Sequence, residues 1–466
     1  MSEDFSADLV VLGAGPAGLA AAWWAARRGL SVVVLERAGR VGGMAGSFEV
    51  AGVRVDHGSH RLHPATPPYL MAELRGLLGD DMQTRPRNGR LRVADRWVGF
   101  PLRPGELARA LPARLLARIA ADAATGPLRR PHGDTYAEVI RSGLGPALYE
   151  EMYAPYAVKL WGLPGDQIAG EQARRRITAD SPGKVVARML RGRKGGTGQG
   201  RVFHYPRRGF GQIVEALAEA GTAAGADIRL GVTAEWLEPG AGGVRVGIAG
   251  GRVEAEHVFS TIPMPALGRL TRPGPAPEVL KAAGRLRFRA MVLVYIVHAG
   301  GRYTRFDAHY LPGSGTPVTR ISEPANYRVS DTDPGDRTVL CAEIPCATGD
   351  SVWAAPDDDL AGLVEDALMR TGLPAPRSAG VVVRRLPHVY PVYEVGYARH
   401  LAALDRWAGG LPGVTTFGRL GLFAHDNTHH ALAMAHDAVA ALGSGRFDEG
   451  AWEAARRRFA GHVVED

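Results

Sequence analysis

The chain has 466 residues, 45% of them hydrophobic and 22% charged, so it can bury a large interior. Its longest apolar runs, such as residues 291–297, are of strand length and fall far short of the roughly 20 residues that cross a bilayer. The first residues lack the basic and apolar regions of a secretory signal. Cys341 and Cys346 give neither a disulfide framework nor a metal-ligand pattern. A cytoplasmic chain without integral membrane association is therefore expected.

Positive charge exceeds negative charge, because 56 Lys and Arg stand against 48 Asp and Glu, a net charge of +8. The excess is rich in arginine, with clusters at residues 174–176 and 191–201. These clusters lack the interleaved aromatic residues of a base-stacking surface, so nucleic acid is not expected as a partner. They are compatible with an anionic small-molecule substrate or with a polyanionic surface as partner.

The N-terminal sequence predicts a strand over residues 8–12, a helix over residues 19–28 and a second strand over residues 31–35. Between the first strand and the helix, residues 13–18 read Gly-Ala-Gly-Pro-Ala-Gly. A GxGxxG turn between a strand and a helix is typical of a site that binds a dinucleotide.

The residue types of this turn suit a diphosphate. Gly13 permits a tight turn, Gly15 lets the backbone approach the phosphates, and Gly18 lets helix and strand pack closely. Glu36 lies 18 residues after Gly18, where a carboxylate can accept hydrogen bonds from a ribose. The predicted cofactor site therefore begins with Gly13, Gly15, Pro16, Ala17, Gly18 and Glu36. NAD and FAD both satisfy this pattern.

The rest of the chain alternates between helical and strand patterns. Helices are predicted over residues 73–78, over most of residues 104–190, over residues 212–224 and from about Asn427 onward. A hairpin is predicted over residues 90–100 with its turn near Asp95, and residues 190–201, with five glycines, are expected to form a mobile lid. Further strands are predicted over residues 227–230, 232–237, 244–247, 253–259, 290–297, 338–344, 380–385 and 414–417.

The residues after Glu36 favour FAD. Residues 37–44, Arg-Ala-Gly-Arg-Val-Gly-Gly-Met, resemble the extended glycine element of the flavoproteins with two dinucleotide-binding domains. These include amine oxidases, protoporphyrinogen oxidases, phytoene desaturases and UDP-galactopyranose mutases. The resemblance implies an FAD cofactor contacted by Arg37, Gly42, Gly43, Met44 and Val232. Neither cysteine lies near the second flavin motif described next, so non-covalent FAD is expected.

Residues 416–423, Thr-Phe-Gly-Arg-Leu-Gly-Leu-Phe, are similar to the second FAD motif of that superfamily. The likeness implies that Gly418 admits the cofactor backbone and that Arg419 contacts phosphate. The helix that starts around Asn427 and Thr428 would then direct its N-terminus at the pyrimidine edge of the flavin. Residues 258–263 match the strand from which such chains cross to the substrate domain.

The resemblance implies an α/β fold: a Rossmann-type FAD-binding domain like that of amine oxidases, with a discontinuous α+β substrate domain. The expected FAD-binding domain comprises residues 1–72, 202–262 and 398–466. The expected substrate domain comprises residues 73–201, which form its helical part, and residues 263–397, which form its sheet.

Within the superfamily, residues 56–63, 153–162, 205–209 and 418–421 resemble the branch of the UDP-galactopyranose mutases. The likeness implies that the histidine loop passes the face of the flavin, so His60 and His63 are candidates for contact with flavin and for catalysis. His57, His60 and His63 are not expected to bind a metal, because no other ligand cluster accompanies them. The chain departs from the mutase pattern after residue 421, where His425 replaces a tyrosine and Asn427 a carboxylate.

The second domain supplies further candidates, because aromatic residues near a flavin can enclose a substrate and an arginine can hold an anion. They are Tyr310, Arg320, Tyr327, Tyr390 and Tyr393. The predicted catalytic residues are His60, His63, Arg320, Tyr393 and His425.

The resemblance implies an FAD-dependent oxidoreductase that dehydrogenates a small molecule in a biosynthetic reaction, with hydride transfer to flavin N5. No second GxGxxG has strand and helix context, so dioxygen or an external acceptor is expected to reoxidise the flavin. The alternative is a non-redox flavoenzyme of UDP-galactopyranose mutase type that acts on a sugar nucleotide with reduced FAD. The positive charge and residues 153–162 favour this alternative, whereas His425 and Asn427 disfavour it.

Overall fold

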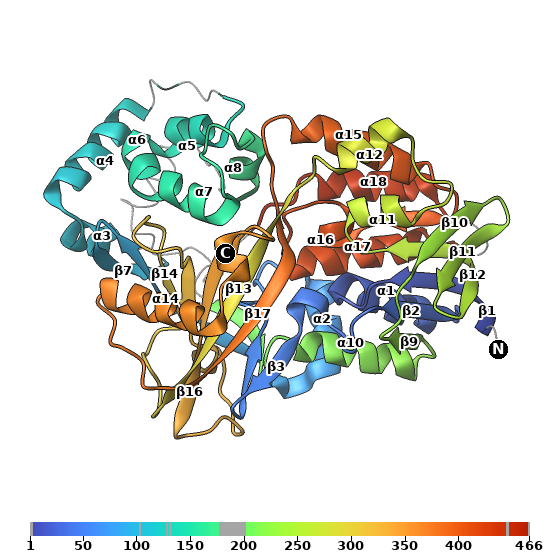
Figure 1. Ribbon diagram of the computed structural model, residues 1–466, viewed down its shortest axis with the longest axis horizontal. Helices are drawn as coiled ribbons and strands as arrows, with labels where there is room; N and C mark the ends of the chain where they lie inside the picture. The colour runs from blue at the N-terminus through green and yellow to red at the C-terminus, as the bar shows by residue number, and fades with distance from the viewer. Residues whose placement is uncertain are drawn as a thin grey trace.

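The computed structural model describes residues 3–101, 104–126, 129, 133–176, 202–443 and 447–464. Two seven-stranded sheets, each covered by helices, form the two halves of the molecule (Figure 1). The expected lid at residues 190–201 lies outside the described residues. No helix in the described ranges has both the length and the apolar character needed to cross a membrane.

The first sheet has the order β10-β11-β12-β1-β2-β9, and β18 pairs with the end of β12. Strands β18, β12, β1, β2 and β9 run parallel, whereas β10, β11 and β12 form an antiparallel meander. The strands are β1 (Glu3–Leu12), β2 (Val32–Glu36), β9 (Asp227–Leu230), β10 (Trp236–Gly240), β11 (Gly243–Ile248), β12 (Gly251–Ser260) and β18 (Val414–Thr416). All of them come from the segments expected to form the FAD-binding domain.

Residues 9–12 of β1 are buried on both faces of the sheet, as central parallel strands are. Leu9 and Val11 pack against the layer of helices α1 (Pro16–Arg27), α10 (Gln212–Ala223) and α17 (Thr428–Ala441). Val10 and Leu12 face the opposite side, in a core shared with the meander. The α1 helix buries mostly alanine, so its neighbours approach closely and its N-terminus is held at the carboxyl end of β1.

The second sheet has the order β17-β13-β16-β15-β14-β6-β7 and is antiparallel except between β14 and β6. Its strands are β6 (Gly89–Val93), β7 (Arg96–Phe100), β13 (Phe288–Ala299), β14 (Ala308–Tyr310), β15 (Arg320–Ser322), β16 (Arg337–Cys346) and β17 (Ser378–Pro391). They all come from the segments expected to form the substrate domain, although the domain limits themselves stay a prediction.

The central strand β13 separates two cores. Val292 and Val294 pack under α14 (Asp357–Arg370). Met291, Leu293 and Tyr295 face the other way, toward the hairpin of β3 (Ser47–Val50) and β4 (Val53–Asp56). This alternation directs one face of the second sheet at the loops of the first half of the molecule.

The remaining helices lie around these sheets. At one end of the second sheet (Figure 1) are α3 (Pro104–Ala110), α4 (Ala113–Thr125), α5 (Tyr136–Leu144), α6 (Pro146–Leu148), α7 (Ala154–Trp161) and α8 (Gly170–Arg176). The others are α2 (Pro68–Leu78), α11 (Met264–Leu270), α12 (Pro277–Ala283), α13 (Ser351–Ala354), α15 (Tyr397–Gly409), α16 (Gly418–Gly421) and α18 (Glu449–Phe459). A two-stranded ribbon joins β5 (Met82–Pro86) to β8 (Val202–Pro206).

Most predicted elements are present, and the hairpin over residues 90–100 turns at Ala94 and Asp95, both with positive φ. The predicted strand over residues 232–237 is wrong for its first part, because β10 begins only at Trp236. Val232 instead donates its N–H to the carbonyl of Glu36 at 2.9 Å, so this segment crosses the end of β2 as a loop. The strand predicted over residues 8–12 extends back to Glu3, because β1 pairs with β12 along its whole length.

Candidate functional site

The turn between β1 and α1 forms a cradle for a diphosphate. Gly13 has a φ of +102°, and its N–H donates to the carbonyl of Leu35 at 2.9 Å. A Cβ on Gly18 would lie 2.0 Å from the carbonyl oxygen of Gly13, so only glycine fits there. A Cβ on Gly15 would have no atom within 4 Å, so the space beside Gly15 is open to a ligand.

The N-terminus of α1 offers its backbone N–H groups to that space. Gly15 is the N-cap and Pro16 opens the helix, so no side chain caps the first turn, and the turn holds no acidic residue. Uncapped N–H groups and the positive end of the helix dipole form an anion site. Gly13, Gly15, Pro16, Ala17 and Gly18 are thus brought together around one open, positively polarised position.

Glu36 ends β2 beside this cradle. Its carboxylate oxygens accept the N–H groups of Ala14 and Ala38, at 2.9 and 2.8 Å. Each oxygen keeps a second lone pair that could accept a ribose hydroxyl. Val232 lies next to Glu36 through its backbone hydrogen bond, whereas the side chain of Arg37 is exposed.

The glycine element after Glu36 folds over the cradle. Gly42 donates its N–H to the carbonyl of Ala14 at 2.7 Å, and a Cβ on Gly43 would lie 3.6 Å from the Cα of Gly15. Met44 then lines the cavity that adjoins the cradle. The element therefore leads from the diphosphate position to the cavity.

This cavity has a volume of about 170 Å³ and lies between the second sheet and the loops after β4 and β18. Its polar lining includes His57, Ser59, His60, Arg61, His63, Arg87, Tyr156, Arg176, Tyr310, Thr319, Arg320, Glu343, Tyr390, Arg419, Asp426, Asn427 and Thr428. Met291 and Leu293 of β13, with Leu160, Leu386 and Val389, give it an apolar floor.

The loop that carries the histidines is fixed by the buried Asp56 at the end of β4. Its carboxylate accepts hydrogen bonds from Ser47 Oγ and Tyr205 Oη, both at 2.6 Å, and from the N–H of Phe210 at 3.0 Å. Its carbonyl accepts the hydroxyl of Tyr295 at 2.5 Å. Burial raises the pKa of Asp56, and these hydrogen bonds offset part of that effect. The loop is therefore rigid where it enters the site.

His60 packs against the ring of Phe210, with ring centroids 5.3 Å apart. Burial, with nearby arginines, lowers the pKa of His60 to about 3 and that of His57 to about 4. Both imidazoles are therefore neutral near pH 7. The Nδ1 of His63 accepts the N–H of Ala65 at 3.1 Å, so His63 also shapes the end of the loop.

Arg320 and Glu343 lie opposite each other on β15 and β16. The guanidinium of Arg320 donates to both carboxylate oxygens of Glu343, at 2.8 and 2.9 Å, and the pair is largely buried. The carboxylate also accepts the N–H of Ser59 at 2.8 Å, which ties the histidine loop to the second sheet.

Arg61 holds the far wall of the cavity. It pairs with the buried Asp307 at 3.1 Å and donates to the hydroxyl of Tyr310 at 3.1 Å. Its guanidinium also lies over the rings of Phe203 and Tyr327, at 5.0 and 4.7 Å. The hydroxyl of Tyr327 contacts Ser59 Oγ, so Tyr327 supports the loop rather than lining the cavity.

Arg419, at the start of α16, lies on the opposite side. It donates to the carbonyls of Val389 and Asp426, at 2.8 and 3.2 Å, and its guanidinium lies 5.3 Å from the ring centroid of Tyr390. Burial lowers the pKa of Arg419. Its Nε has no hydrogen-bond partner within the described ranges, which leaves a donor for an anionic ligand.

Two predicted catalytic residues lie behind the cavity rather than in it. The hydroxyl of Tyr393 donates to the carbonyl of Phe423 at 3.0 Å, and its ring stacks on Tyr397. His425 is fully buried, and its Nε2 lies 2.7 Å from the carbonyl of Pro391. Burial holds the pKa of His425 well below its usual value, so it is a neutral donor to that carbonyl. His60, His63 and Arg320, by contrast, line the cavity together.

Asn427 and Thr428 place the N-terminus of α17 at the cavity. Asn427 is the N-cap of this helix of 14 residues, so the positive end of its dipole faces the lining. An N-terminus in this position suits negative charge on a bound ring system.

Sequence reasoning did not identify Glu343, Arg61 or Tyr156 as site residues. Glu343 did leave a signal, because it is an acidic residue within an otherwise apolar strand, and a buried charge requires a partner. Arg61 and Tyr156 lie in two segments that resemble the mutase branch, residues 56–63 and 153–162. The sequence pattern of these segments does not indicate which of their side chains face a cavity.

A diphosphate cradle at the end of a parallel sheet, beside a cavity lined by a second sheet, is the arrangement of an enzyme that binds a dinucleotide cofactor. The chain belongs to the family of flavin-containing amine oxidoreductases, whose model matches residues 16–457. The predicted fold class and the predicted FAD cofactor are confirmed by this membership.

Solved structures share the fold. Reduced UDP-galactopyranose mutase matches with a TM-score of 0.81 at 19% identity, over 98% of this chain and 100% of that one. A protein of Exiguobacterium sp. 255-15 assigned as a protoporphyrinogen oxidase matches with a TM-score of 0.73 at 20% identity, over 94% and 98%. A putrescine oxidase variant matches with a TM-score of 0.66 at 17% identity, over 94% and 98%. At these identities the likeness concerns the fold alone.

Among curated proteins, menaquinone reductase of Mycobacterium tuberculosis is 66% identical over 38 residues. The matched segment is 8% of this chain and 9% of that protein. The chain thus matches less than a tenth of this relative's length, and the match says nothing of the substrate.

Proposed function

We propose that the chain is an FAD-dependent oxidoreductase that dehydrogenates a small anionic molecule held in the cavity. The observation that carries this proposal is the composition of the described lining, which holds five arginines, Arg61, Arg87, Arg176, Arg320 and Arg419, and two carboxylates, Glu343 and Asp426. Glu343 pairs with Arg320, and Asp307 pairs with Arg61. Arg419 keeps an Nε donor that no described residue accepts, and this donor suits an anionic ligand.

FAD, when bound, supplies the two-electron acceptor for this chemistry. The protein then has to orient the substrate, exclude water and stabilise charge. The cradle at Gly13–Gly18 would bind the diphosphate, and Glu36 the ribose. Arg419 and the N-terminus of α17 would bind negative charge at the opposite end of the cofactor.

The side chains of the cavity suit orientation rather than proton transfer. His57 and His60, with pKa values of about 4 and about 3, are too weakly basic to take a proton readily near neutral pH. Tyr310 and Tyr390 form two walls against which an extended substrate can lie. Because no second dinucleotide fingerprint follows in the sequence, dioxygen or an external acceptor would complete the cycle.

A second candidate function is a sugar-nucleotide mutase, favoured by the match of fold to UDP-galactopyranose mutase and by the arginines that suit a nucleotide diphosphate. Two residues oppose it. His425 is buried away from the cavity, and Asn427 offers an amide where the mutase pattern has a carboxylate.

Anaerobic reduction of the oxidised, FAD-loaded protein tests the proposal. Two groups of compounds are added to the protein. One group is anionic and comprises amino acids, hydroxy acids and dicarboxylates; the other is cationic and is represented by putrescine. We expect loss of flavin absorbance with a member of the anionic group only, and weaker binding of that compound to an Arg320→Gln variant. Reduction by the cationic amine alone would contradict an anionic substrate.

A further inference from the structure

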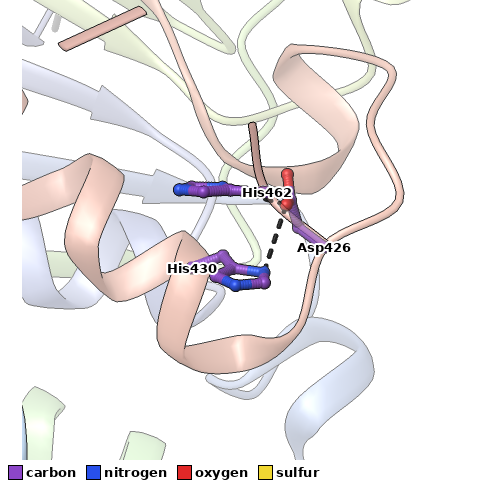
Figure 2. Close-up of side chains that lie close together, drawn as sticks. All are labelled: Asp426, His430 and His462. Atoms are coloured by element: carbon purple, nitrogen blue, oxygen red, sulfur yellow. Dashed lines mark hydrogen bonds and ion pairs between the residues drawn. The ribbon is translucent and has the colours of Figure 1, made fainter. Parts of the chain in front are cut away.

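Three side chains with metal-binding atoms converge at the N-terminus of α17, and of these only that of Asp426 also lines the cavity. Asp426 precedes the helix, His430 lies in its first turn, and His462 follows α18 in the C-terminal segment. The Nδ1 atoms of His430 and His462 lie 3.3 and 3.1 Å from the same oxygen of Asp426. Figure 2 shows the two imidazole rings lying one above the other beside this carboxylate; their planes are nearly parallel and their centroids are 4.2 Å apart.

The cluster is enclosed. The side chain of Asp426 is 0% exposed, that of His430 13% and that of His462 17%. The second carboxylate oxygen of Asp426 is buried and has no hydrogen-bond partner among the described residues. Leaving a buried carboxylate oxygen unpaired costs free energy, so the site has capacity for a positively charged ligand.

The Nδ1 atom of His430 lies beside a donor, the N–H of Asn427, and an acceptor, the carboxylate of Asp426. This Nδ1 accepts the N–H of Asn427 at 3.2 Å and therefore presents a lone pair, which also faces Asp426. If Nδ1 instead carries a proton and donates to Asp426, it faces the N–H of Asn427. One of the two contacts is repulsive in either protonation state. A cation bound to Nδ1 of His430 would take the single lone pair of that nitrogen, so the N–H of Asn427 would then turn to another acceptor. The two stacked rings would also rotate so that both Nδ1 atoms point at the ion.

The spacing suits a small divalent transition-metal ion. Zinc binds histidine nitrogen and carboxylate oxygen at roughly 2.0–2.2 Å, so two ligands at a tetrahedral angle lie about 3.3 Å apart. The observed separations from Asp426 are 3.3 Å for His430 and 3.1 Å for His462, and all three ligand atoms lie within 4.8 Å of one another. Two imidazoles and a carboxylate are a donor set that zinc and its neighbours prefer.

We propose that Asp426, His430 and His462 bind one divalent transition-metal ion, with zinc as the ion to test. The sequence predicted no metal, but that expectation considered the two cysteines and His57, His60 and His63, and not these three residues. The ion would fasten the C-terminal segment to α17. Val464, two residues beyond His462, lines the cavity and donates its N–H to the carbonyl of Arg175 at 2.7 Å. The metal would thus hold one wall of the substrate site in place.

Zinc binding to the FAD-loaded, tag-free protein tests this site. After treatment with a chelator, the protein is dialysed against buffered zinc, and bound metal is measured by mass spectrometry. We expect one zinc per chain, and affinity lower by about tenfold or more in His462→Ala and in Asp426→Asn. The matched control is His436→Ala, because His436 lies on the same helix with Asp437 3.8 Å away, and we expect it to bind zinc like the wild type.

Folding is checked by the flavin spectrum, and His462→Ala keeps the test decisive because His462 lies after the last helix. Zinc should raise the Tm of the wild type and of His436→Ala but not that of His462→Ala. A wild-type protein that binds no zinc would overturn the proposal. Equal zinc affinity of His462→Ala and the wild type, or equal loss in His436→Ala, would overturn it as well.

Discussion

Arg320 and Glu343 form a buried ion pair whose carboxylate also holds the histidine loop. Two donors of the Arg320 guanidinium and the N–H of Ser59 share the same carboxylate, with distances of 2.8 to 3.0 Å. The pair follows from sheet register, since the two residues lie opposite each other on neighbouring strands. A structural link between the second sheet and His60 therefore passes through Glu343.

Replacing Glu343 by Gln should destabilise the protein strongly, because it leaves the Arg320 charge buried without its counter-ion. Removal of one partner of a buried pair typically costs about 3–5 kcal/mol. The control is Asp357→Asn, which breaks the more exposed pair with Arg385 and should cost about 1 kcal/mol or less. Urea unfolding of both variants measures the difference, and equal losses would show that Glu343 is not the link described here.

The two glycines of the cradle should respond differently to a methyl group. In Gly15→Ala the methyl enters open space and φ is −80°, so the flavin-free protein should keep its Tm but bind FAD more weakly. In Gly18→Ala the methyl meets the carbonyl of Gly13 at 2.0 Å, so the Tm of the flavin-free protein itself should fall. Calorimetric titration with FAD and thermal unfolding separate the two. Wild-type FAD affinity in Gly15→Ala would mean that the diphosphate lies elsewhere.

Arg419→Lys should weaken FAD binding although the charge is kept. The two terminal nitrogens of Arg419 reach the carbonyls of Val389 and Asp426 at once, and a single ammonium cannot reproduce that fork. We expect a loss on the order of tenfold in FAD affinity, which corresponds to about 1.4 kcal/mol. Arg252→Lys, at a half-exposed surface pair, is the control and should leave the affinity unchanged. Equal FAD affinity of Arg419→Lys and Arg252→Lys would contradict a role of Arg419 in binding the cofactor.

His257 should make part of the stability dependent on pH. Burial lowers its pKa to about 4, against about 6.5 in the unfolded chain. The folded state therefore binds this proton less readily than the unfolded chain does. The contribution of neutral His257 to the free energy of unfolding is complete above pH 6.5 and is lost as the pH falls toward about 4. The loss amounts to on the order of 3 kcal/mol. In His257→Gln, urea unfolding at pH values on either side of this window should show a shallower dependence; identical slopes would contradict it.

The diphosphate cradle could be predicted from the sequence because all of its parts are close in the chain. The strand, turn, helix and second strand span only residues 3–36, and each has its own local signal. Glu36 follows by counting from Gly18. The early start of β1 could not be predicted, because Glu3 joins the strand through its pairing with Gly251.

The cavity could be predicted only in part. The His60 and Arg419 segments resemble motifs, but their meeting with Glu343 depends on the register of β15 and β16. The position of His462 beside Asp426 depends on how the C-terminal segment returns over α17, and no pattern in that segment indicates it. Tyr393 and His425 were chosen from their neighbourhood in the sequence, and burial rather than chain position decides that they lie behind the cavity.

The choice between oxidoreductase and mutase is tested most directly by UDP-galactopyranose under anaerobic conditions. The substrate is added to oxidised protein and, separately, to protein reduced with dithionite, and the furanose product is quantified by chromatography. The account predicts no conversion in either state, because Asn427 and the buried His425 replace the mutase residues. Conversion by the reduced protein alone, at about 1 s⁻¹ or faster, would contradict it and make the sugar-nucleotide mutase the function of this chain.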